Sequence, residues 1–212
     1  TTLIQSLEHP AAKALGGAYL NDADMMRDFK VAPAAMQIHH AWIGGLLEHS
    51  LQLMKLADGM LPNYPRLNRD IILLSLFIHD MGKVEELRWD RGFEYTREGN
   101  LIGHIARGAT WLEGKAKVAE KNLGEALPDG FLTVMQHIIL SHHGQLEHGA
   151  AKLPSTPEAI FVSQLDNLDA HTQTSLDCAR PWEQAVAGNE AFTDRLWSLN
   201  TKLYRRDPLK NP

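Results

Sequence analysis

Histidine and aspartate are the residues of this chain whose types and spacing could do chemistry. The sequence has 212 residues and 11 histidines. The pair His79-Asp80 directly follows a nearly continuous apolar run over residues 71–78. Two polar side chains at the end of a buried helix need partners, because burying an unpaired polar group is unfavourable. A metal ion would satisfy both of them.

Other potential metal ligands lie in separate apolar helical segments, which directs them toward a shared interior. They are His49, His104, His142, His143 and Asp166. Imidazole and carboxylate groups without a thiolate suit Mn²⁺, Fe²⁺, Co²⁺, Ni²⁺ or Zn²⁺. An aspartate beside a histidine can bridge two ions, and two ions about 3.5–4 Å apart can clamp a phosphate. Each histidine alone would fit a core or surface role, but the set favours a metal centre.

The elements that must position these residues are almost all helical. Apolar periodicity predicts helices over residues 2–15, 18–30, 35–60, 69–80, 100–123, 130–143, 156–176 and 188–205. The first two are separated at Gly16-Gly17, and Asn68 is the expected N-cap of the helix over 69–80. Residues 87–96 place aromatic side chains around an Asp-Arg-Gly turn, which predicts a small β-hairpin. The expected fold is an all-α bundle with this hairpin as an insert.

The composition narrows the class of protein. Hydrophobic residues make up 44% and charged residues 22%, as in ordinary globular proteins. The net charge of −5 argues against a domain whose whole surface binds nucleic acid. A weak basic cluster does stand near the C-terminus, at Lys202, Arg205, Arg206 and Lys210. The single Cys178 excludes an internal disulfide framework.

Targeting signals are missing from the sequence. It has no apolar run of about 18 residues and no signal peptide, so we expect a cytoplasmic protein without a membrane partner. The chain begins with Thr1-Thr2 rather than with methionine. This start suggests the C-terminal part of a longer chain.

The order His49, His79-Asp80, Asp166 resembles the HD superfamily of metal-dependent phosphohydrolases. The similarity is closer to the YhaM-type 3′→5′ exoribonucleases. It is carried by residues 33–35, 39–50, 79–83, 94–96, 103–105, 139–144 and 166–169. Members of that family typically carry an additional N-terminal OB-fold domain that binds single strands, and we expect this domain to be missing from this sequence. The HD-GYP cyclic-dinucleotide phosphodiesterases are less similar, because Gly45 and Gly144-Gln145-Leu146 occupy positions of their motifs.

The resemblance implies one HD domain over residues 1–212 and a two-metal site. In this reading one ion is held by His49, His79, Asp80 and Asp166. Asp80 bridges to a second ion, which is held by His104 together with His142, His143 or both. Lys83 faces the substrate phosphate, so Asp80 and Lys83 are the expected catalytic residues.

Two further residues are expected to contact the substrate. His40 would face away from His49 on one straight helix, which favours a place at the rim of the site over a ligand role. Its alternative is a structural hydrogen bond. Tyr95 on the predicted hairpin could stack on a base, unless it packs the hairpin onto the domain.

These features favour a metal-dependent phosphodiesterase as the function. The expected reaction is 3′→5′ exonucleolytic hydrolysis of single-stranded RNA or DNA by a hydroxide that bridges two divalent transition-metal ions. A phosphohydrolase of small nucleotides is an alternative that the net charge of −5 favours. A non-catalytic, metal-stabilised nucleotide-binding module and an HD-type di-iron oxygenase are two more. The oligomeric state is left open.

Overall fold

The computed structural model describes residues 1–36, 42–89, 92–180 and 191–209. Two compact units divide the chain, Thr1–Asp166 and Asn167–Pro212. The described helices are α1 (Thr2–Gln5), α2 (Pro10–Leu20), α3 (Ala23–Phe29), α4 (Gly45–Met60), α5 (Arg69–Ile78), α6 (Lys83–Glu86), α7 (Arg97–Leu101), α8 (Gly103–Leu123), α9 (Phe131–Ser141) and α10 (Pro157–Ala179). Short 3-10 turns, η1 (Leu61–Asn63) and η2 (Leu146–His148), lie in two connections. The predicted all-α architecture is confirmed, whereas the single domain over 1–212 stays a prediction.

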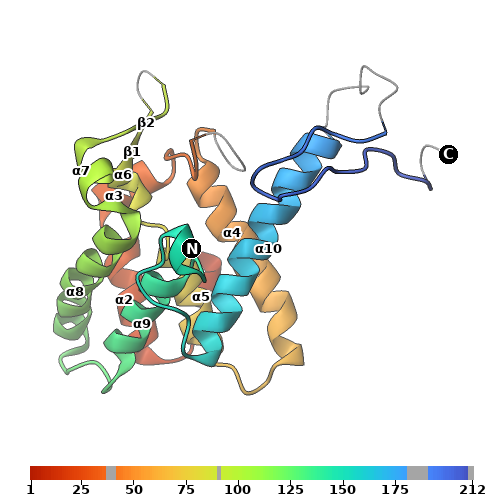
Figure 1. Ribbon diagram of the computed structural model, residues 1–212. Coiled ribbons are helices and arrows are strands. Elements are labelled where there is room, and N and C mark those ends of the chain that lie inside the picture. Colours follow the sequence, from red (N-terminus) through yellow and green to blue (C-terminus); the bar gives the residue numbers. More distant parts are fainter. Residues whose placement is uncertain (37–41, 90–91, 181–190, 210–212) are drawn as a thin grey trace. The chain divides into compact units, whose positions relative to one another are not determined.

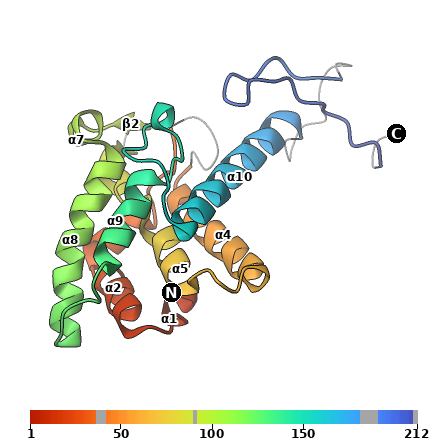
Figure 2. The same cartoon turned by 60° about the horizontal axis from the view of Figure 1, so that its bottom comes forward.

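Helix α5 forms the centre of the first unit. Every residue of 72–78 is buried, as its nearly continuous apolar sequence predicts. Its start is fixed by Asn68, whose side chain accepts a hydrogen bond from the Ile71 N–H at 3.1 Å. Helices α2, α4 and α9 pack around α5, and both views in Figures 1 and 2 show it between them. Burying a leucine or isoleucine side chain contributes about 1.5–3 kcal/mol, so this helix anchors the fold.

The N-terminal helices differ from the prediction. Helix α2 runs through Gly16-Gly17, so the predicted break there is wrong. The two helix starts lie elsewhere. Helix α2 is capped by His9, whose ring accepts a hydrogen bond from the Ala11 N–H, and α3 is capped by Asp22. Capping side chains therefore outweigh the low helix propensity of two glycines.

The predicted helix over residues 35–60 is shorter than expected. Helix α4 begins only at Gly45, because Gly44 adopts the left-handed conformation with φ +84°. The Gly44 N–H bonds to the Val31 carbonyl at 3.0 Å, and the Leu46 N–H bonds to the Ala32 carbonyl at 3.0 Å. These bonds tie the start of α4 to the segment after α3. Residues 37–41 lie outside the described part.

The predicted hairpin is present. Strands β1 (Leu87–Arg88) and β2 (Glu94–Tyr95) pair antiparallel, with Leu87 opposite Tyr95 and Arg88 opposite Glu94. Arg88 and Glu94 also form an ion pair across the strands. The hairpin therefore connects α6 to α7.

Helix α8 begins beside the hairpin and covers one side of the unit. It packs along α2 and α9, an arrangement that Figure 2 shows clearly. The predicted helix over 100–123 is divided at Ile102, because the following Gly103 adopts the left-handed conformation with φ +76°. Thr96 caps the separate short helix α7 through the Gly99 N–H at 2.8 Å. Further along α8, Lys115 bonds to Asp22 at 2.6 Å. None of the described helices is long and apolar enough to cross a membrane.

The second unit contains the rest of α10 and the C-terminal segment. The helix predicted over 188–205 is wrong for the described residues 191–209, which form no helix. They make two isolated antiparallel bridges instead, Phe192 with Tyr204 and Leu196 with Thr201. Backbone N–H and C=O groups that a helix would use are paired between two extended segments instead.

Candidate metal centre

The carboxylate of Asp80 lies at the centre of a cluster of histidines. Asp80 follows the C-terminal end of α5 and is 2% exposed. Its Oδ2 lies 3.8 Å from His49 Nε2 and 3.5 Å from His79 Nε2. Its Oδ1 lies 3.4 Å from His104 Nε2 and also 3.4 Å from His142 Nε2. One carboxylate thus faces two sets of imidazoles with its two oxygens.

The side chains near Oδ2 make up the first group: His49, His79 and Asp166. They come from α4, from the end of α5 and from α10. His49 Nε2 lies 3.2 Å from Asp166 Oδ1, and His79 Nε2 lies 3.9 Å from the same oxygen. The ligand atoms of His49, His79 and Asp80 all lie within 4.8 Å of one another. This group combines imidazole with a second carboxylate.

The side chains near Oδ1 make up the second group: His104, His142 and His143. His104 is the second residue of α8, and the other two follow directly after α9. Ligand atoms of these three histidines and Asp80 also lie within 4.8 Å of one another. The ring of His104 lies 5.8 Å from that of His142 and 5.2 Å from that of His143, between ring centres. Both members of the His142-His143 pair therefore reach the cluster.

Backbone carbonyls fix the orientation of three of the rings. The Nδ1 of His79 lies 3.0 Å from the Leu76 carbonyl oxygen. The Nδ1 of His142 lies 2.7 Å from the Ile139 carbonyl oxygen, and the Nδ1 of His143 lies 2.7 Å from the His148 carbonyl oxygen. A carbonyl oxygen can only accept, so each Nδ1 carries the proton. Nε2 then presents a lone pair, which is the form in which histidine binds a metal.

Glu86 orients the fourth ring, and the sequence did not single it out. Its carboxylate accepts hydrogen bonds from the His104 backbone N–H at 3.0 Å and from the His104 Nδ1 at 2.9 Å. Thr96 in turn holds the Glu86 backbone, since its N–H bonds to the Glu86 carbonyl at 2.9 Å. Nothing in the sequence pairs Glu86 with a histidine 18 positions later; only the packing of α6 against α8 does so.

A glycine permits that packing. A Cβ atom on Gly82 would lie 2.1 Å from the His104 carbonyl oxygen, closer than real contacts allow. Gly82 is thus the residue that lets the start of α8 approach the turn carrying His79 and Asp80. The motif His79-Asp80-Met81-Gly82-Lys83 therefore supplies both ligands and the room for a neighbouring helix.

Burial and charge set the protonation states of the cluster. Burial lowers the pKa of His79 to about 4 and that of His143 to about 4. Burial alone would raise the pKa of Asp80, but the cation of Lys83 and the neighbouring His79 hold it well below its usual range. At neutral pH the rings of His79 and His143 are therefore neutral and the Asp80 carboxylate is ionised, which is the state that metal binding requires.

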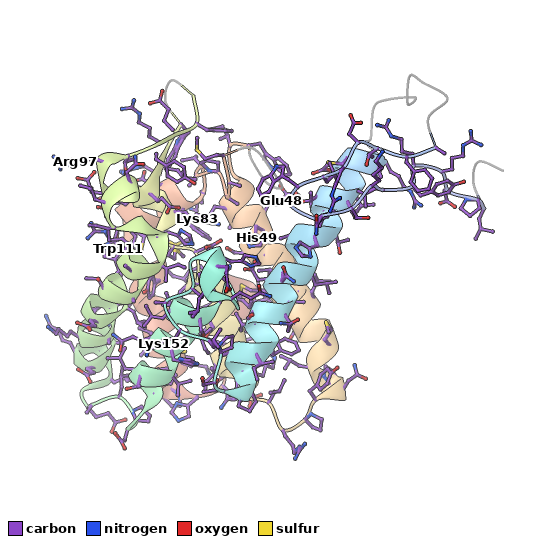
Figure 3. The ribbon with its side chains drawn as sticks, viewed as in Figure 1. Glu48, His49, Lys83, Arg97, Trp111 and Lys152 are labelled. Carbon is purple, nitrogen blue, oxygen red and sulfur yellow. The ribbon has the colours of Figure 1, made fainter. Side chains whose placement is uncertain are left out.

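Lys83 supplies the positive charge next to Asp80. Its Nζ lies 2.7 Å from Asp80 Oδ2, and the side chain is 15% exposed. Burial alone would lower the pKa of Lys83, but the carboxylate of Asp80 outweighs it and raises the pKa. The ammonium group therefore stays charged at the edge of the cluster. Figure 3 labels Lys83 at the start of α6 and His49 on α4.

Unsatisfied polar atoms show that a metal ion fits these residues. Four buried atoms of the cluster make no hydrogen bond with the described part of the chain: His79 Nε2, His104 Nε2, His142 Nε2 and Asp80 Oδ1. Buried polar atoms nearly always have partners. All four are lone-pair donors in a single cluster, so one kind of ligand, a cation, would satisfy them together.

The remaining predicted residues lie elsewhere. Tyr95 stands on β2 and is 51% exposed, and no described contact joins it to the cluster. His40 falls outside the described residues. His137 accepts a hydrogen bond from the Ser155 N–H at 2.8 Å and belongs to neither group. Glu48, next to His49, accepts a hydrogen bond from Trp42 Nε1 at 2.9 Å.

Comparison with known proteins identifies the family. The family model for the HD domain matches residues 46–171, which include all the residues of the two groups. The chain belongs to the HD domain family. No solved structure matches the chain.

Three relatives carry the same name in different bacteria. The HD domain chain is 36% identical over 177 residues to the 3′-5′ exoribonuclease YhaM of Bacillus subtilis (strain 168), with 84% of this chain and 53% of the relative covered. It is 37% identical to YhaM of Geobacillus sp. (strain WCH70), with 81% and 50% covered. For YhaM of Listeria innocua serovar 6a the identity is 41%, with 84% and 53% covered. The chain thus spans about half the length of these relatives.

Proposed function

We propose that this chain is a metal-dependent 3′→5′ exonuclease that hydrolyses single-stranded RNA or DNA in the cytoplasm. The observation that carries the proposal is the carboxylate of Asp80, with one oxygen toward each of two histidine groups. The relatives named 3′-5′ exoribonuclease YhaM support the same reaction. Because the chain spans about half of those proteins, their activity is an inference here.

Two divalent ions fit the site, one in each group. The first group would hold an ion through His49, His79, Asp80 and Asp166. The second would hold an ion through His104, Asp80, His142 and His143. These donors suit Mn²⁺, Fe²⁺, Co²⁺, Ni²⁺ or Zn²⁺. When bound, such ions polarise phosphoryl oxygens and make water a better nucleophile near neutral pH.

Protein groups position the substrate and balance its charge. Lys83 cannot be a ligand while it is protonated, because an ammonium group has no lone pair. Its position 2.7 Å from Asp80 lets it stabilise negative charge that develops on the phosphoryl oxygens. Asp80 is the residue that the two groups share, and its carboxylate also keeps Lys83 charged.

Two residues complete the proposed substrate contacts. Tyr95, half exposed on β2, could stack against a base. His40 is assigned to the rim of the site on its sequence position alone, since it lies outside the described residues. Replacing either residue should raise KM more than it lowers kcat.

A second candidate function is hydrolysis of small nucleotides. Several cations of the first unit are already paired with acids, among them Arg69 with Asp58, Arg107 with Glu85 and Lys115 with Asp22. A chain with a net charge of −5 would attract a long polyanion weakly. A small nucleotide needs only the site itself.

One experiment separates these functions. The protein is purified without chelator, its metal content is measured, and it is incubated with an oligonucleotide labelled at either the 5′ or the 3′ end. An exonuclease of the proposed polarity shortens the 5′-labelled strand stepwise and releases the 3′ label at once as a mononucleotide. A small-nucleotide phosphohydrolase leaves the strand intact but hydrolyses mononucleotides. A binding module retards the strand without product.

A further inference from the structure

The C-terminal segment has a composition that differs from the rest of the chain. Residues 191–209, here called the C-terminal hairpin, contain four cations and two acids, a net charge of +2 within a chain of −5. The cations are Arg195, Lys202, Arg205 and Arg206. Lys202 and Arg206 are exposed and form no ion pair with any described residue. Positive charge is therefore available to an external anion on this segment.

The same segment exposes aromatic rings. Trp197 is 83% exposed, Phe192 is 52% exposed and Tyr204 is 47% exposed. Large aromatic side chains are usually buried to a high degree, so three exposed rings within 13 positions call for a partner. The rings of Phe192 and Tyr204 lie 5.3 Å apart between centres, which makes one apolar surface of the two.

Backbone bonds arrange these rings and cations on one short hairpin. The Thr193 N–H bonds to the Leu203 carbonyl at 2.9 Å, and the Leu196 N–H bonds to the Thr201 carbonyl at 2.8 Å. Trp197 stands at the start of the four-residue turn, which closes with Asn200 in the left-handed conformation at φ 52°. The hairpin thus carries one ring at its tip and a pair of rings at its base.

From this arrangement we infer that the C-terminal hairpin binds single-stranded nucleic acid through base stacking on Trp197 and phosphate contacts to Lys202 and Arg206. Single-strand binders combine exposed aromatic rings with cations in this way, because every base has a stacking face and every linkage has a charge. Aromatic rings and arginines also suit a protein interface, whereas the exposed Lys202 favours nucleic acid, because lysine is depleted at protein interfaces. The choice of nucleic acid as the partner rests on the proposed function.

Affinity for an unpaired strand tests the inference without requiring hydrolysis. The probe is a fluorescein-labelled oligouridylate of about twelve nucleotides with phosphorothioate linkages, which resist cleavage. Trp197→Ala should raise its Kd about tenfold, whereas Trp197→Phe should keep most of the affinity because a ring remains. Tyr64→Ala is the matched control, since Tyr64 is 51% exposed in the first unit. It should leave Kd unchanged.

Salt dependence tests the cations separately. Lys202→Ala should reduce the slope of log K against log salt by about 0.7, the contribution of one phosphate contact on a single strand. The control Lys117→Ala removes an exposed lysine of α8 and should leave the slope unchanged. A duplex of equal length should bind more weakly and respond little to Trp197→Ala, because its bases are already stacked.

The outcomes distinguish this inference from the proposed function. Unchanged affinity in Trp197→Ala would overturn the inference. If the molar mass measured by light scattering also drops in that variant, the hairpin is a contact between copies of the chain. Hydrolysis of bis(p-nitrophenyl) phosphate should be the same in Trp197→Ala and wild type. If neither protein hydrolyses any phosphodiester but the affinity difference persists, the proposed function fails and the binding surface stands.

Discussion

The two groups of side chains on either side of Asp80 differ in charge and in what holds them. The first group adds a second carboxylate, Asp166, directly beside its histidines at 3.2 Å. The second group contains only imidazoles, and its nearest additional carboxylate, Glu86, contacts the cluster through His104. Negative charge stabilises a divalent cation more directly in the first case. The comparison indicates that the first group binds its ion more tightly and that the second depends on its supporting residues.

Asp80→Asn should have the largest effect, because it removes the negative charge that both groups share. We expect most of the metal content to be lost and activity to fall by more than about 10³-fold. Elemental analysis and oligonucleotide digestion measure the two quantities, and circular dichroism checks the fold. A variant that retains two ions per chain would show that the groups do not depend on a common carboxylate.

His49→Ala and His104→Ala should each remove about one ion per chain and separate the two groups. His49 contacts the Oδ2 side of Asp80, and His104 contacts the Oδ1 side. We expect His104→Ala to keep the tighter ion and His49→Ala to keep the weaker one, so a chelator titration should strip the latter variant first. Loss of metal at the same chelator concentration in both variants would contradict a difference in metal affinity between the two groups.

Lys83→Ala should separate chemistry from metal binding. Since the ammonium group is not a ligand, we expect both ions and the fold to be kept while kcat falls about 10²–10³-fold. Lys83→Arg should recover only part, because a planar guanidinium does not replace a point charge. Steady-state kinetics alongside metal analysis give the answer. Full activity would assign Lys83 only a structural ion pair with Asp80.

Glu86→Gln should weaken only the ion of the second group. The amide oxygen can still accept from the His104 backbone, but the neutral side chain no longer raises the basicity of the ring. Loss of such a supporting carboxylate typically lowers metal affinity about 10–100-fold. The matched control is Glu85→Gln on the same short helix, where Glu85 pairs with Arg107 at 2.8 Å. Equal metal affinity in the two variants would contradict a positioning role for Glu86.

The smallest effect is expected near the middle of α8, at the ion pair between Lys115 and Asp22. Asp22→Asn keeps the cap on α3 but removes the ion pair with Lys115, so the free energy of unfolding should fall by about 0.5 kcal/mol without loss of metal. The Lys115 hydrogen bond lowers the pKa of Asp22 in the folded state. Its contribution is therefore present above the unfolded pKa and lost as pH falls through the folded pKa. Denaturant unfolding at pH 7 and pH 3 checks this: the difference between variant and wild type should shrink at the lower pH.

Sequence patterns predicted the local features well. Asn68 caps α5, an apolar run forms that buried helix, and aromatic residues flank a hairpin, because each depends on neighbours within a few positions. Predictions failed where distant contacts decided the outcome. Helix α4 starts late because Gly44 bonds to Val31, and residues 191–209 pair with each other rather than forming a helix.

The sequence by itself determined the chemical types of the site: imidazoles, carboxylates and one lysine, without thiolates, placed at the ends or within apolar helices. Which of them share a carboxylate oxygen was decided only by the tertiary structure. His104 lies 24 positions after Asp80 and Asp166 lies 87 positions after His79, so the distances within these two pairs follow from the packing of α8 and α10, not from helical spacing. Glu86 is the clearest example of a residue whose role is set by tertiary packing. Its role exists only because Gly82 lets α8 come close enough for His104 to reach it.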